Sequence, residues 1–490
     1  MPAAKRSEAA NHRPSDSPPA AARQRPRPGP APVIDARSAE SGGAANFGSG
    51  GPERSGGTHG PERGAAFSWR SEAGERKSGP SRAGAKRPTN SQLRLGVVGI
   101  GQRAGLAAPA NRAGVARVVS CADPSPRGRA DARTLFGPDV AVHDDHRRML
   151  DDRLDAVFVL TPDDRHVEPA LFFLAAGVPV FVEKPLAITV ADCDRLLRAA
   201  RDTGTRLYVG HNLRHLPVLR RMRALIDEGV IGRVRSVWVR HFVGHGGDYY
   251  FKDWHAERAR TTGLLLQKGA HDLDVIHWLA GGWSRDVVAM GDLAVYGANP
   301  RRPEPVGAAR VGDWFAPEVW PPSALTGLNP VVDVEDVSLM LSRLDNGVLA
   351  SYQQCHFTPD YWRNYTVIGD EGRMENFGDG LEDDRPAIKV WNLRRSGYRS
   401  DADRHEFVAA DGPHGGADAA LVAEFLRFAA EGGPTRTSPV AAREAVAAGV
   451  AATMSLRAGG ARTEVPPLAP DLVRYFADHQ AEPGDPAGTS

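Results

Sequence analysis

The chain has 490 residues, of which 41% are hydrophobic and 25% are charged, and its formal net charge is +1. A near-neutral balance gives no indication of a nucleic-acid-binding protein. The sequence contains no run of about 18 apolar residues, so we expect no membrane-spanning segment.

Residues 1–92 differ in composition from the rest of the chain. They are dominated by Pro, Gly, Ser, Ala and Arg, and their few apolar residues follow no period. Such a segment cannot bury enough apolar surface to offset the entropy of ordering, so we predict a disordered arm. The arm carries a formal charge of +7 and leaves −6 on the remainder. We interpret the basic arm as a solvated tail and expect no nucleic-acid partner.

The lack of a signal-peptide pattern and the spacing of the cysteines both indicate a cytoplasmic protein. The first residues include positive charges but no apolar core of a signal peptide. Cys121, Cys193 and Cys355 lie far apart and form neither a disulfide framework nor a metal-binding spacing. We therefore predict a reduced, cytoplasmic protein.

The first predicted domain covers residues 93–212 and begins with a nucleotide-binding turn. The apolar strand at residues 93–98 runs directly into Gly99-Ile-Gly101-Gln-Arg-Ala104, followed by an Ala-rich helical segment. In this pattern Gly99 permits a tight turn, Gly101 lets the backbone approach a pyrophosphate, and Ala104 allows helix and strand to pack closely. The helix N-terminus offers free N–H groups to the phosphates.

The next strand, residues 116–122, ends at Asp123, twenty-two residues after Gly101. A carboxylate at this distance can accept the ribose hydroxyls of NAD and would repel the 2′-phosphate of NADP. Arg127 follows and could stack on adenine or meet a 2′-phosphate. We therefore favour NAD over NADP as the cofactor.

Two further buried strands, residues 154–160 and 178–183, end in polar residues. The first leads to Thr161 and Pro162, and the second leads to Lys184. Ligands of open α/β sheets bind at such carboxyl ends, so both ends should face one crevice. Strands that alternate with helices at this spacing predict a doubly wound parallel sheet, the Rossmann fold. Taken alone, Lys184 could equally be a solvated loop lysine.

The second predicted domain covers residues 213–475, before a flexible tail at 476–490. Long strands replace the strand–helix alternation, and Asn346-Gly347 between apolar alternations indicates a hairpin. We predict an α+β domain with a large, mostly antiparallel, open sheet. The whole chain is thus of the α/β class, with a Rossmann domain followed by a sheet domain.

One segment of this half, residues 262–278, reads as a helix with Thr262 as its N-cap. Gln267 and His271 are four residues apart and share a face, with Asp274 about one turn further on. A histidine on a rigid helix suits acid–base catalysis near neutral pH, although a core histidine has the same pattern. The polar residues wind around the helix, so we predict no metal site.

Two loops accompany this helix. Residues 245–255 combine hydrogen-bonding and aromatic side chains, Trp254 among them, which suits a polyhydroxylated ligand or an ordinary packed loop. Residues 298–332 are Pro-rich and could form either a lid over the site or a surface loop without a functional role.

The order of the motifs from about residue 93 to residue 466 resembles the Gfo/Idh/MocA oxidoreductase family. The motifs are Gly99-x-Gly101-x-x-Ala104, Ala122-Asp123, Thr161-Pro162 with His166, Glu183-Lys184-Pro185, and Gly269-x-His271-x-x-Asp274. The resemblance implies NAD(P)-dependent oxidation or reduction of a sugar or cyclitol hydroxyl and homo-oligomers built through the sheet domain. It also implies that Lys184 contacts the reacting hydroxyl and that His271 exchanges its proton.

The predicted site follows from these motifs. The catalytic residues are Lys184 and His271. The cofactor-binding residues are Gly99, Gly101, Ala104, Asp123, Arg127, Thr161, Pro162, His166, Glu183 and Lys184. The substrate-binding candidates are Arg214, Trp254, Gln267 and Asp274.

Gln267 is a departure from the family pattern, which often has an aspartate there. A glutamine cannot hold the negative charge that would raise the pKa of His271. The leading hypothesis is a dehydrogenase of a sugar, glycoside or cyclitol. The alternatives are a redox-assisted glycoside hydrolase or lyase with retained NAD, and a sensor that binds NAD or sugar without turnover.

Overall fold

The computed structural model describes residues 92–111, 114–378, 386–394, 397, 399–400, 402–407 and 414–480. The predicted arm, apart from Gln92, and residues 481–490 of the predicted tail lie outside the described residues. The division of the chain at residue 212 stays a prediction.

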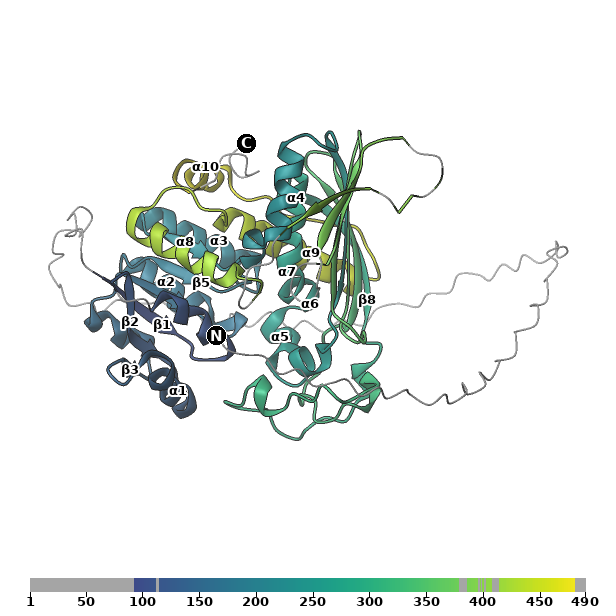
Figure 1. Ribbon diagram of the computed structural model, residues 1–490. Helices are drawn as coiled ribbons and strands as arrows, with labels where there is room; N and C mark the ends of the chain where they lie inside the picture. The colour runs from purple at the N-terminus through teal and green to yellow at the C-terminus, as the bar shows by residue number, and fades with distance from the viewer. Residues whose placement is uncertain are drawn as a thin grey trace, which may run out of the picture. The chain divides into compact units, whose positions relative to one another are not determined.

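The first sheet consists of six parallel strands in the order β3-β2-β1-β4-β5-β6. The strands are β1 (Leu93–Val98), β2 (Ala116–Ala122), β3 (Ala141–His143), β4 (Ala156–Val159), β5 (Val180–Val182) and β6 (Leu207–Val209). Their apolar residues are buried on both faces, so β4 directs Val157 into one core cluster and Phe158 into another. This is the predicted doubly wound Rossmann sheet, seen at the lower left of Figure 1.

Short helices connect these strands. They are η1 (Gln102–Ala110), α1 (Pro126–Phe136), η2 (His146–Asp152), η3 (Asp163–Arg165), α2 (Val167–Ala175), α3 (Val190–Thr203) and η4 (Asn212–His215). Helix α3 begins at the N-cap Thr189, whose side chain accepts a hydrogen bond from the backbone N–H of Asp192. The Ala-rich segment after the nucleotide turn is the 3-10 helix η1, which contains Pro109.

The second sheet has nine strands in the order β14-β13-β12-β11-β7-β10-β9-β8-β15. The strands are β7 (Val234–Phe242), β8 (Ser284–Asp292), β9 (Val337–Leu344), β10 (Leu349–Cys355), β11 (Trp362–Gly369), β12 (Arg373–Phe377), β13 (Ala387–Trp391), β14 (Asp403–Glu406) and β15 (Thr463–Glu464). Only β7 and β10 pair in parallel; the other described pairs are antiparallel. Gly347 has φ +83° in the turn between β9 and β10. The predicted antiparallel sheet is confirmed.

Helices cover one face of this sheet (Figure 1). The α-helices of the second half of the chain, which include this cover, are α4 (Pro217–Asp227), α5 (Arg258–Thr261), α6 (Leu264–Gln267), α7 (Gly269–Ala280), α8 (Ala417–Glu431), α9 (Pro439–Arg457) and α10 (Pro470–His479). The short ones are η5 (Gly247–Phe251), η6 (Trp254–Ala256), η7 (Tyr296–Ala298), η8 (Val311–Asp313) and η9 (Pro322–Ala324). Helix α9 packs on β8 and α7, whereas α8 returns to the Rossmann sheet, where Phe425 lies 4.9 Å from Phe158 between ring centroids.

The helix predicted from Thr262 onward is divided into α6 and α7 at Lys268. Thr262 is not its N-cap: its backbone φ is +67°, and Gly263 precedes α6. The hydroxyl of Thr262 instead donates a hydrogen bond to the carbonyl of Ile188 at 2.7 Å. This contact ties the start of α6 to the loop that follows β5.

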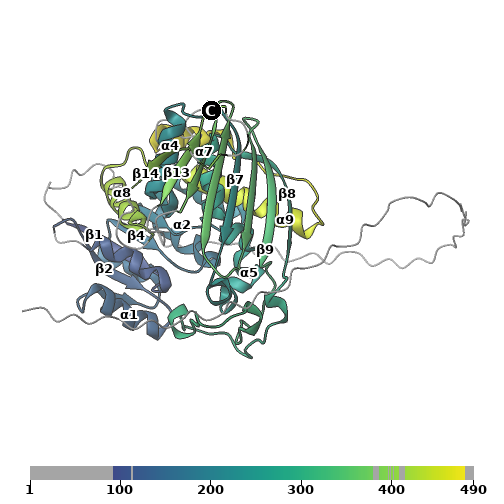
Figure 2. The same ribbon diagram turned by 45° about the vertical axis from the view of Figure 1, so that its right-hand side comes forward.

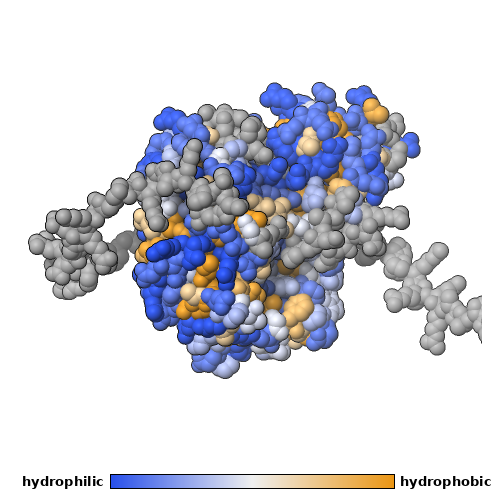
Figure 3. All heavy atoms as spheres, turned by 60° about the vertical axis from the view of Figure 1, so that its left-hand side comes forward, coloured by the Kyte–Doolittle hydropathy of each residue, from blue (hydrophilic) through white to orange (hydrophobic). Residues whose placement is uncertain are grey.

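The other face of the nine-strand sheet carries exposed apolar side chains. They are Trp238, Val288, Met290, Leu339, Leu341 and Leu349. Figure 3 shows another face of the molecule, on which hydrophilic residues surround several groups of apolar residues. None of the helices in the described part of the chain is both long enough and apolar enough to cross a membrane.

A buried ion pair joins the end of the Rossmann sheet to α7. Arg214 in η4 and Asp274 in α7 form two hydrogen bonds of 2.9 Å, and each residue is only 1% exposed. Burial opposes the ionisation of Asp274, but Arg214 and His211 outweigh it and lower the pKa of the carboxyl below its ordinary value. The pair therefore fixes α7 relative to the strand ends of the first sheet.

We expect Asp274→Ala to lower the free energy of unfolding by about 3–5 kcal/mol, because the buried guanidinium of Arg214 loses its counter-ion. Urea unfolding measures this change. Asp471→Ala is the matched control, since Asp471 pairs with Arg201 at the surface, where an ion pair contributes little. Equal losses in the two variants would contradict the structural role of the buried pair.

Candidate functional site

The nucleotide turn between β1 and η1 has the geometry that a bound pyrophosphate requires. Gly99 has φ +87°, and a Cβ there would lie 2.8 Å from the backbone nitrogen of Thr161, so no other residue fits. A Cβ on Gly101 would meet nothing within 4 Å, which leaves open space in front of this backbone. Ala104 is fully buried. These residues fit a dinucleotide cofactor.

Asp123 lies beside this turn, at the end of β2. One carboxylate oxygen accepts a hydrogen bond of 2.8 Å from the backbone N–H of Ile100, and the other accepts one of 2.8 Å from the N–H of Ser125. A Cβ on Gly128 would lie 2.3 Å from Cγ of Asp123, so the glycine makes room for the carboxylate. The predicted ribose ligand and the predicted pyrophosphate turn are thus adjacent.

The Pro-rich segment 298–332, called the strap below, reaches the nucleotide turn from the second half of the chain. Arg310 of the strap donates to the carbonyl of Ile100 and pairs with Asp131 at 2.6 Å. Asp313 pairs with Arg127 at 2.5 Å. The predicted cofactor residue Arg127 is therefore engaged by the strap at the surface of the protein.

The strap also contacts the loop at residues 245–255. The indole N–H of Trp314 donates to the carbonyl of Asp248 at 2.9 Å, and Lys252 donates to the carbonyl of Trp314 at 2.9 Å. The ring of Phe315 lies 5.2 Å from that of His245. One segment therefore touches both the nucleotide turn and the predicted substrate loop.

The strand ends after β4 and β5 are linked by His166. Its Nδ1 lies 2.8 Å from the carbonyl oxygen of Pro185, and its Nε2 lies 2.9 Å from that of Thr161. His166 is buried, and the peptide bond between Lys184 and Pro185 is cis. Pro162 is the first residue after this contact and precedes η3. The imidazole thus lies between backbone carbonyls of the two loops.

Glu183 is engaged by a residue of the nucleotide turn. Its carboxylate accepts a hydrogen bond of 2.6 Å from Arg103 and another of 2.6 Å from the backbone N–H of Lys184. Arg103 also pairs with Asp418 of α8 at 3.0 Å, and Asn212 donates to the same carboxylate at 2.8 Å. This network holds the strand end that carries Lys184.

Lys184 reaches the helix pair α6–α7. Its ammonium lies 3.4 Å from the backbone carbonyl oxygen of Gln267, one turn before His271. The rings of His271 and His211 are 6.3 Å apart in an edge-on arrangement. The structure therefore brings together the lysine and the histidine helix that the sequence separates by more than eighty residues.

Burial and neighbouring cations shift the pKa values of this group. Burial lowers the pKa of the Lys184 ammonium, although Glu183 and Asp163 oppose the shift. Burial, followed by the charges of Lys184, Arg363 and Lys268, holds the pKa of His271 well below its ordinary value. The imidazole of His271 is thus kept neutral, the state that accepts a proton.

Several buried polar atoms here have no hydrogen-bond partner among the described residues. They are Oγ1 of Thr161, Oδ2 of Asp163, Oε1 of Gln267 and Nδ1 of His271. Buried polar groups are normally paired, so this concentration fits a ligand with several hydroxyl groups. Burial raises the pKa of the Asp163 carboxyl above its ordinary value.

The remaining substrate candidates are held by the protein itself. Trp254 stacks on His255 with ring centroids 3.7 Å apart, and the guanidinium of Arg260 lies 5.3 Å from its ring centroid. Arg214 and Asp274 pair with each other. Their substrate contacts stay predictions, and their mutual bonds favour a positioning role.

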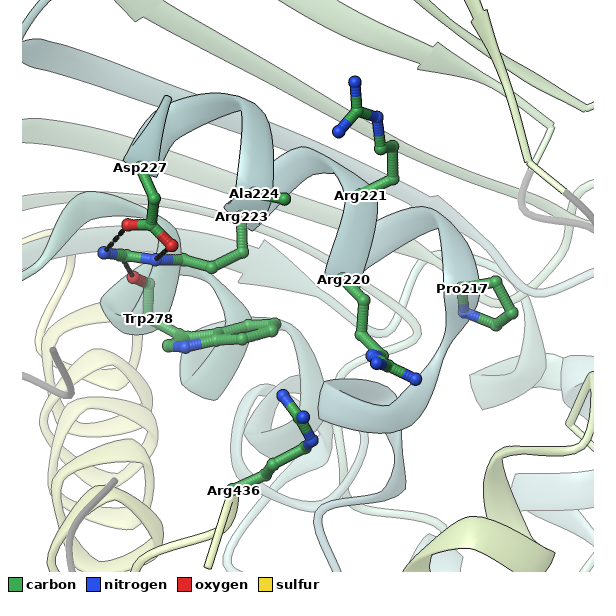
Figure 4. A pocket seen from close by; sticks show the side chains of 8 residues that line it. All are labelled: Pro217, Arg220, Arg221, Arg223, Ala224, Asp227, Trp278 and Arg436. Carbon is green, nitrogen blue, oxygen red and sulfur yellow. Dashed lines mark hydrogen bonds and ion pairs between the residues drawn. The ribbon is translucent and has the colours of Figure 1, made fainter. Parts of the chain in front are cut away.

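A separate hollow lies over α4 and contains none of the predicted site residues (Figure 4). It has a volume of about 440 Å³ and is lined by Pro217, Arg220, Arg221, Arg223, Ala224, Asp227, Trp278 and Arg436. Arg223 is paired there with Asp227 at 2.5 Å. We therefore place the candidate site at Lys184 and His271.

Within the described ranges, no His, Cys, Asp and Glu side chains gather in a metal-binding group.

Three residues of this region were not among the predicted site residues: Arg103, Lys268 and Arg310. Arg103 occupies a variable position of the glycine motif, and Arg310 lies in a segment without periodicity. Lys268 stands beside Gln267 in the sequence, so its place next to a predicted site residue was the only available signal.

Comparison with known proteins gives matches to both halves of the chain. Residues 93–211 match the model of an oxidoreductase family with an NAD-binding Rossmann fold. Residues 219–375 match the model of the GFO/IDH/MocA C-terminal domain. The two matches together cover more than half of the chain.

Individual relatives are more distant. The chain is 33% identical over 202 residues to 1-carboxy-3-chloro-3,4-dihydroxycyclohexa-1,5-diene dehydrogenase of Comamonas testosteroni, with 40% of this chain and 49% of that protein aligned. It is 29% identical over 192 residues to inositol 2-dehydrogenase of Salmonella paratyphi B, with 38% and 54% aligned. The chain thus spans about half the length of these curated relatives.

Among solved structures, the fold is similar to that of levoglucosan dehydrogenase in complex with NADH and levoglucosan. The TM-score is 0.62 at 20% identity, and the match covers 77% of this chain and all of that chain (100%). At this identity the likeness shows the fold. Together with the two family matches and the strand order of both sheets, it leads to one conclusion. The chain belongs to the GFO/IDH/MocA family of oxidoreductases.

Proposed function

We propose that this protein is an NAD-dependent dehydrogenase acting on a ring hydroxyl, or the corresponding ketone, of a sugar, glycoside or cyclitol. The observation that carries the proposal is the approach of the Lys184 ammonium to Gln267, the last residue of α6, one turn before His271 on α7. The inositol and dihydroxycyclohexadiene dehydrogenases named above support a ring-hydroxyl substrate.

Roles for the two residues follow from their chemistry. When bound, the nicotinamide would supply the acceptor for the hydride. In oxidation, neutral His271 takes the hydroxyl proton, and Lys184 donates a hydrogen bond to the oxygen as negative charge develops on it. The unpartnered oxygens of Thr161, Asp163 and Gln267 bind the other hydroxyl groups and orient the ring.

The nucleotide turn and Asp123 are proposed to hold the cofactor, with NAD preferred to NADP. Asp123 presents a carboxylate beside the turn, where it would repel a 2′-phosphate. Arg127, the residue that could have bound this phosphate, is paired with Asp313. Both observations support NAD.

The exposed apolar row on the nine-strand sheet supports a homo-oligomer. Contiguous apolar surface of this kind often marks an interaction site. We propose that Trp238, Leu339 and Leu341 contact a second copy of the chain. Sedimentation velocity tests this proposal.

Three free cysteines support the proposed cytoplasmic location, where thiols stay reduced.

A redox-assisted glycoside hydrolase or lyase is a second candidate function. It is favoured by the strap, since Arg310 closes over the nucleotide turn and would help to retain NAD. Such an enzyme would be purified with NAD bound and would release an aglycone without net formation of NADH. Extraction of cofactor from purified protein, followed by assays on glycosides, discriminates the two functions.

Lys184→Met should reduce kcat by roughly 10²–10³-fold, because the developing oxyanion loses its donor. Binding of NADH should remain close to that of the unchanged protein, as followed by NADH fluorescence. Lys389→Met, in β13 of the second sheet, is the matched control. Full turnover in Lys184→Met would contradict the catalytic role proposed for Lys184. If NAD binds but no sugar, cyclitol or glycoside is oxidised by the unchanged protein, a sensor is favoured instead.

The pH profile should report His271. Since its pKa is held below 6.5, the base stays neutral and kcat/KM for oxidation should remain on its plateau through pH 6.5, then fall at lower pH. Gln267→Asp adds a negative charge one turn away from His271. The pH at which kcat/KM begins to fall on the acidic side should therefore rise by about one pH unit. Gln267→Asn keeps a neutral amide and is the control. An identical limb in both variants would contradict the role of His271.

The strap should slow the release of cofactor. Arg310→Gln removes the contact with Ile100 and the pair with Asp131, so NADH should dissociate severalfold faster in a stopped-flow displacement experiment. Arg301→Gln is a control within the strap, because Arg301 bonds to the nearby carbonyl of Gly297. Equal dissociation rates in the two variants would exclude a contribution of the strap.

A further inference from the structure

Lys268 stands between α6 and α7 without an ion-pair partner among the described residues. The side chain is partly buried, and its ammonium lies 5.5 Å from the ring centroid of Tyr250. No carboxylate in the described part of the chain lies within ion-pair distance of this ammonium, and no hydrogen bond to it is found there. The preceding residue in the sequence is Gln267, whose Oε1 is buried without a hydrogen-bond partner among the described residues.

The carboxylate that acts on Lys268 electrostatically is Asp272, in the first turn of α7. Both of its oxygens are already engaged by three hydrogen bonds and an ion pair. The hydrogen bonds come from Tyr365 at 2.5 Å, His241 at 2.9 Å and Tyr352 at 3.0 Å, and the ion pair is with Arg363 at 3.2 Å. These donors outweigh burial and hold the pKa of Asp272 below its ordinary value. Asp272 is therefore saturated and leaves Lys268 without a counter-ion.

Cations surround the same space. Burial, followed by the charges of Arg363 and Lys184, holds the pKa of Lys268 well below its ordinary value. On the Rossmann side, Asp163 acts electrostatically on Lys184, and burial raises the pKa of its carboxyl. Glu183 is bound to Arg103. A carboxylate bound beside Lys268 would offset the repulsion from Arg363 and Lys184 and raise the pKa of the ammonium.

We propose that Lys268 binds a carboxylate carried by the substrate, so that the site selects an acidic sugar or a carboxylated cyclitol over its neutral analogue. The inference rests on the proposed function and names its substrate class. A carboxylate would supply the missing counter-ion and accept charge-assisted hydrogen bonds from the ammonium. Tyr250 supports the ammonium from one side through its ring face. Lys184 remains available for the reacting hydroxyl.

Binding of matched ligand pairs to the NADH-loaded protein tests the proposal. The probes are D-glucuronate and D-galacturonate, each compared with its neutral uronamide of the same shape, with NADH fluorescence as the readout. We expect at least one acid to bind about tenfold or more tightly than its amide, as a hydrogen bond between charged groups provides. Lys268→Met should bring this ratio close to one, whereas Lys268→Arg should retain a preference for the acid.

Lys389→Met is the matched control, because it removes a lysine whose ammonium lies over Phe377 on the second sheet. Thermal unfolding and NADH affinity check that Lys268→Met is folded. The proposal is overturned if no acid is preferred to its amide in the unchanged protein, or if the preference survives in Lys268→Met. Equal competition by sodium chloride or inorganic phosphate at matched ionic strength would assign the site to a free anion and also overturn it.

The readout separates this inference from the proposed function. A preference for the acid that depends on Lys268, without formation of NADH from NAD and any probe, would support the carboxylate site and contradict the dehydrogenase. Oxidation of neutral sugars with no preference for acids would support the dehydrogenase and contradict the carboxylate site.

Discussion

The buried pair between Arg214 and Asp274 is the constraint on which the candidate site depends. Arg214 follows the last strand of the Rossmann sheet, and Asp274 lies about one turn after His271 on α7. Two short hydrogen bonds in a fully buried setting leave little freedom between these elements. The distance between the strand end at Lys184 and the helix at His271 is therefore set by an ion pair that need not touch substrate. Thr262, bonded to Ile188, adds a second tie between the same two halves.

Much of the fold could be predicted from local pattern. The Rossmann strands are short β-branched runs that end at Gly99, Asp123, Thr161 and Lys184, and the hairpin of β9 and β10 turns at Asn346-Gly347. Such signals lie within a few residues of one another, so one sequence contains them in full. The break at Lys268 could not be predicted in this way. Tertiary contacts engage this segment, since Thr262 bonds to Ile188 and the ammonium of Lys184 lies 3.4 Å from the carbonyl oxygen of Gln267, and contacts of this kind override helical pattern.

The candidate site was predictable only where a motif carried it. Lys184 and His271 belong to motifs, and the structure brings their elements together. Arg103 and Arg310 bind partners 315 and 210 residues away, and no periodicity in the sequence encodes contacts of that range. The same reason applies to Arg214 and Asp274, whose types suggested substrate ligands and whose partners turned out to be each other. A polar residue in a predicted site can thus hold another residue in place without contacting substrate itself.

The strap has a consequence for the order of events in a catalytic cycle. Arg310 touches the nucleotide turn at Ile100, while Trp314, four residues later, is bonded to the backbone of Asp248 in the loop at residues 245–255, called here the aromatic loop. A segment fixed at both points cannot lift from one without disturbing the other. Substrate packed against the aromatic loop would hold the strap down and keep the cofactor in place. If the proposed cofactor and substrate bind at these two places, this coupling would favour an ordered mechanism, in which the dinucleotide enters first and departs last.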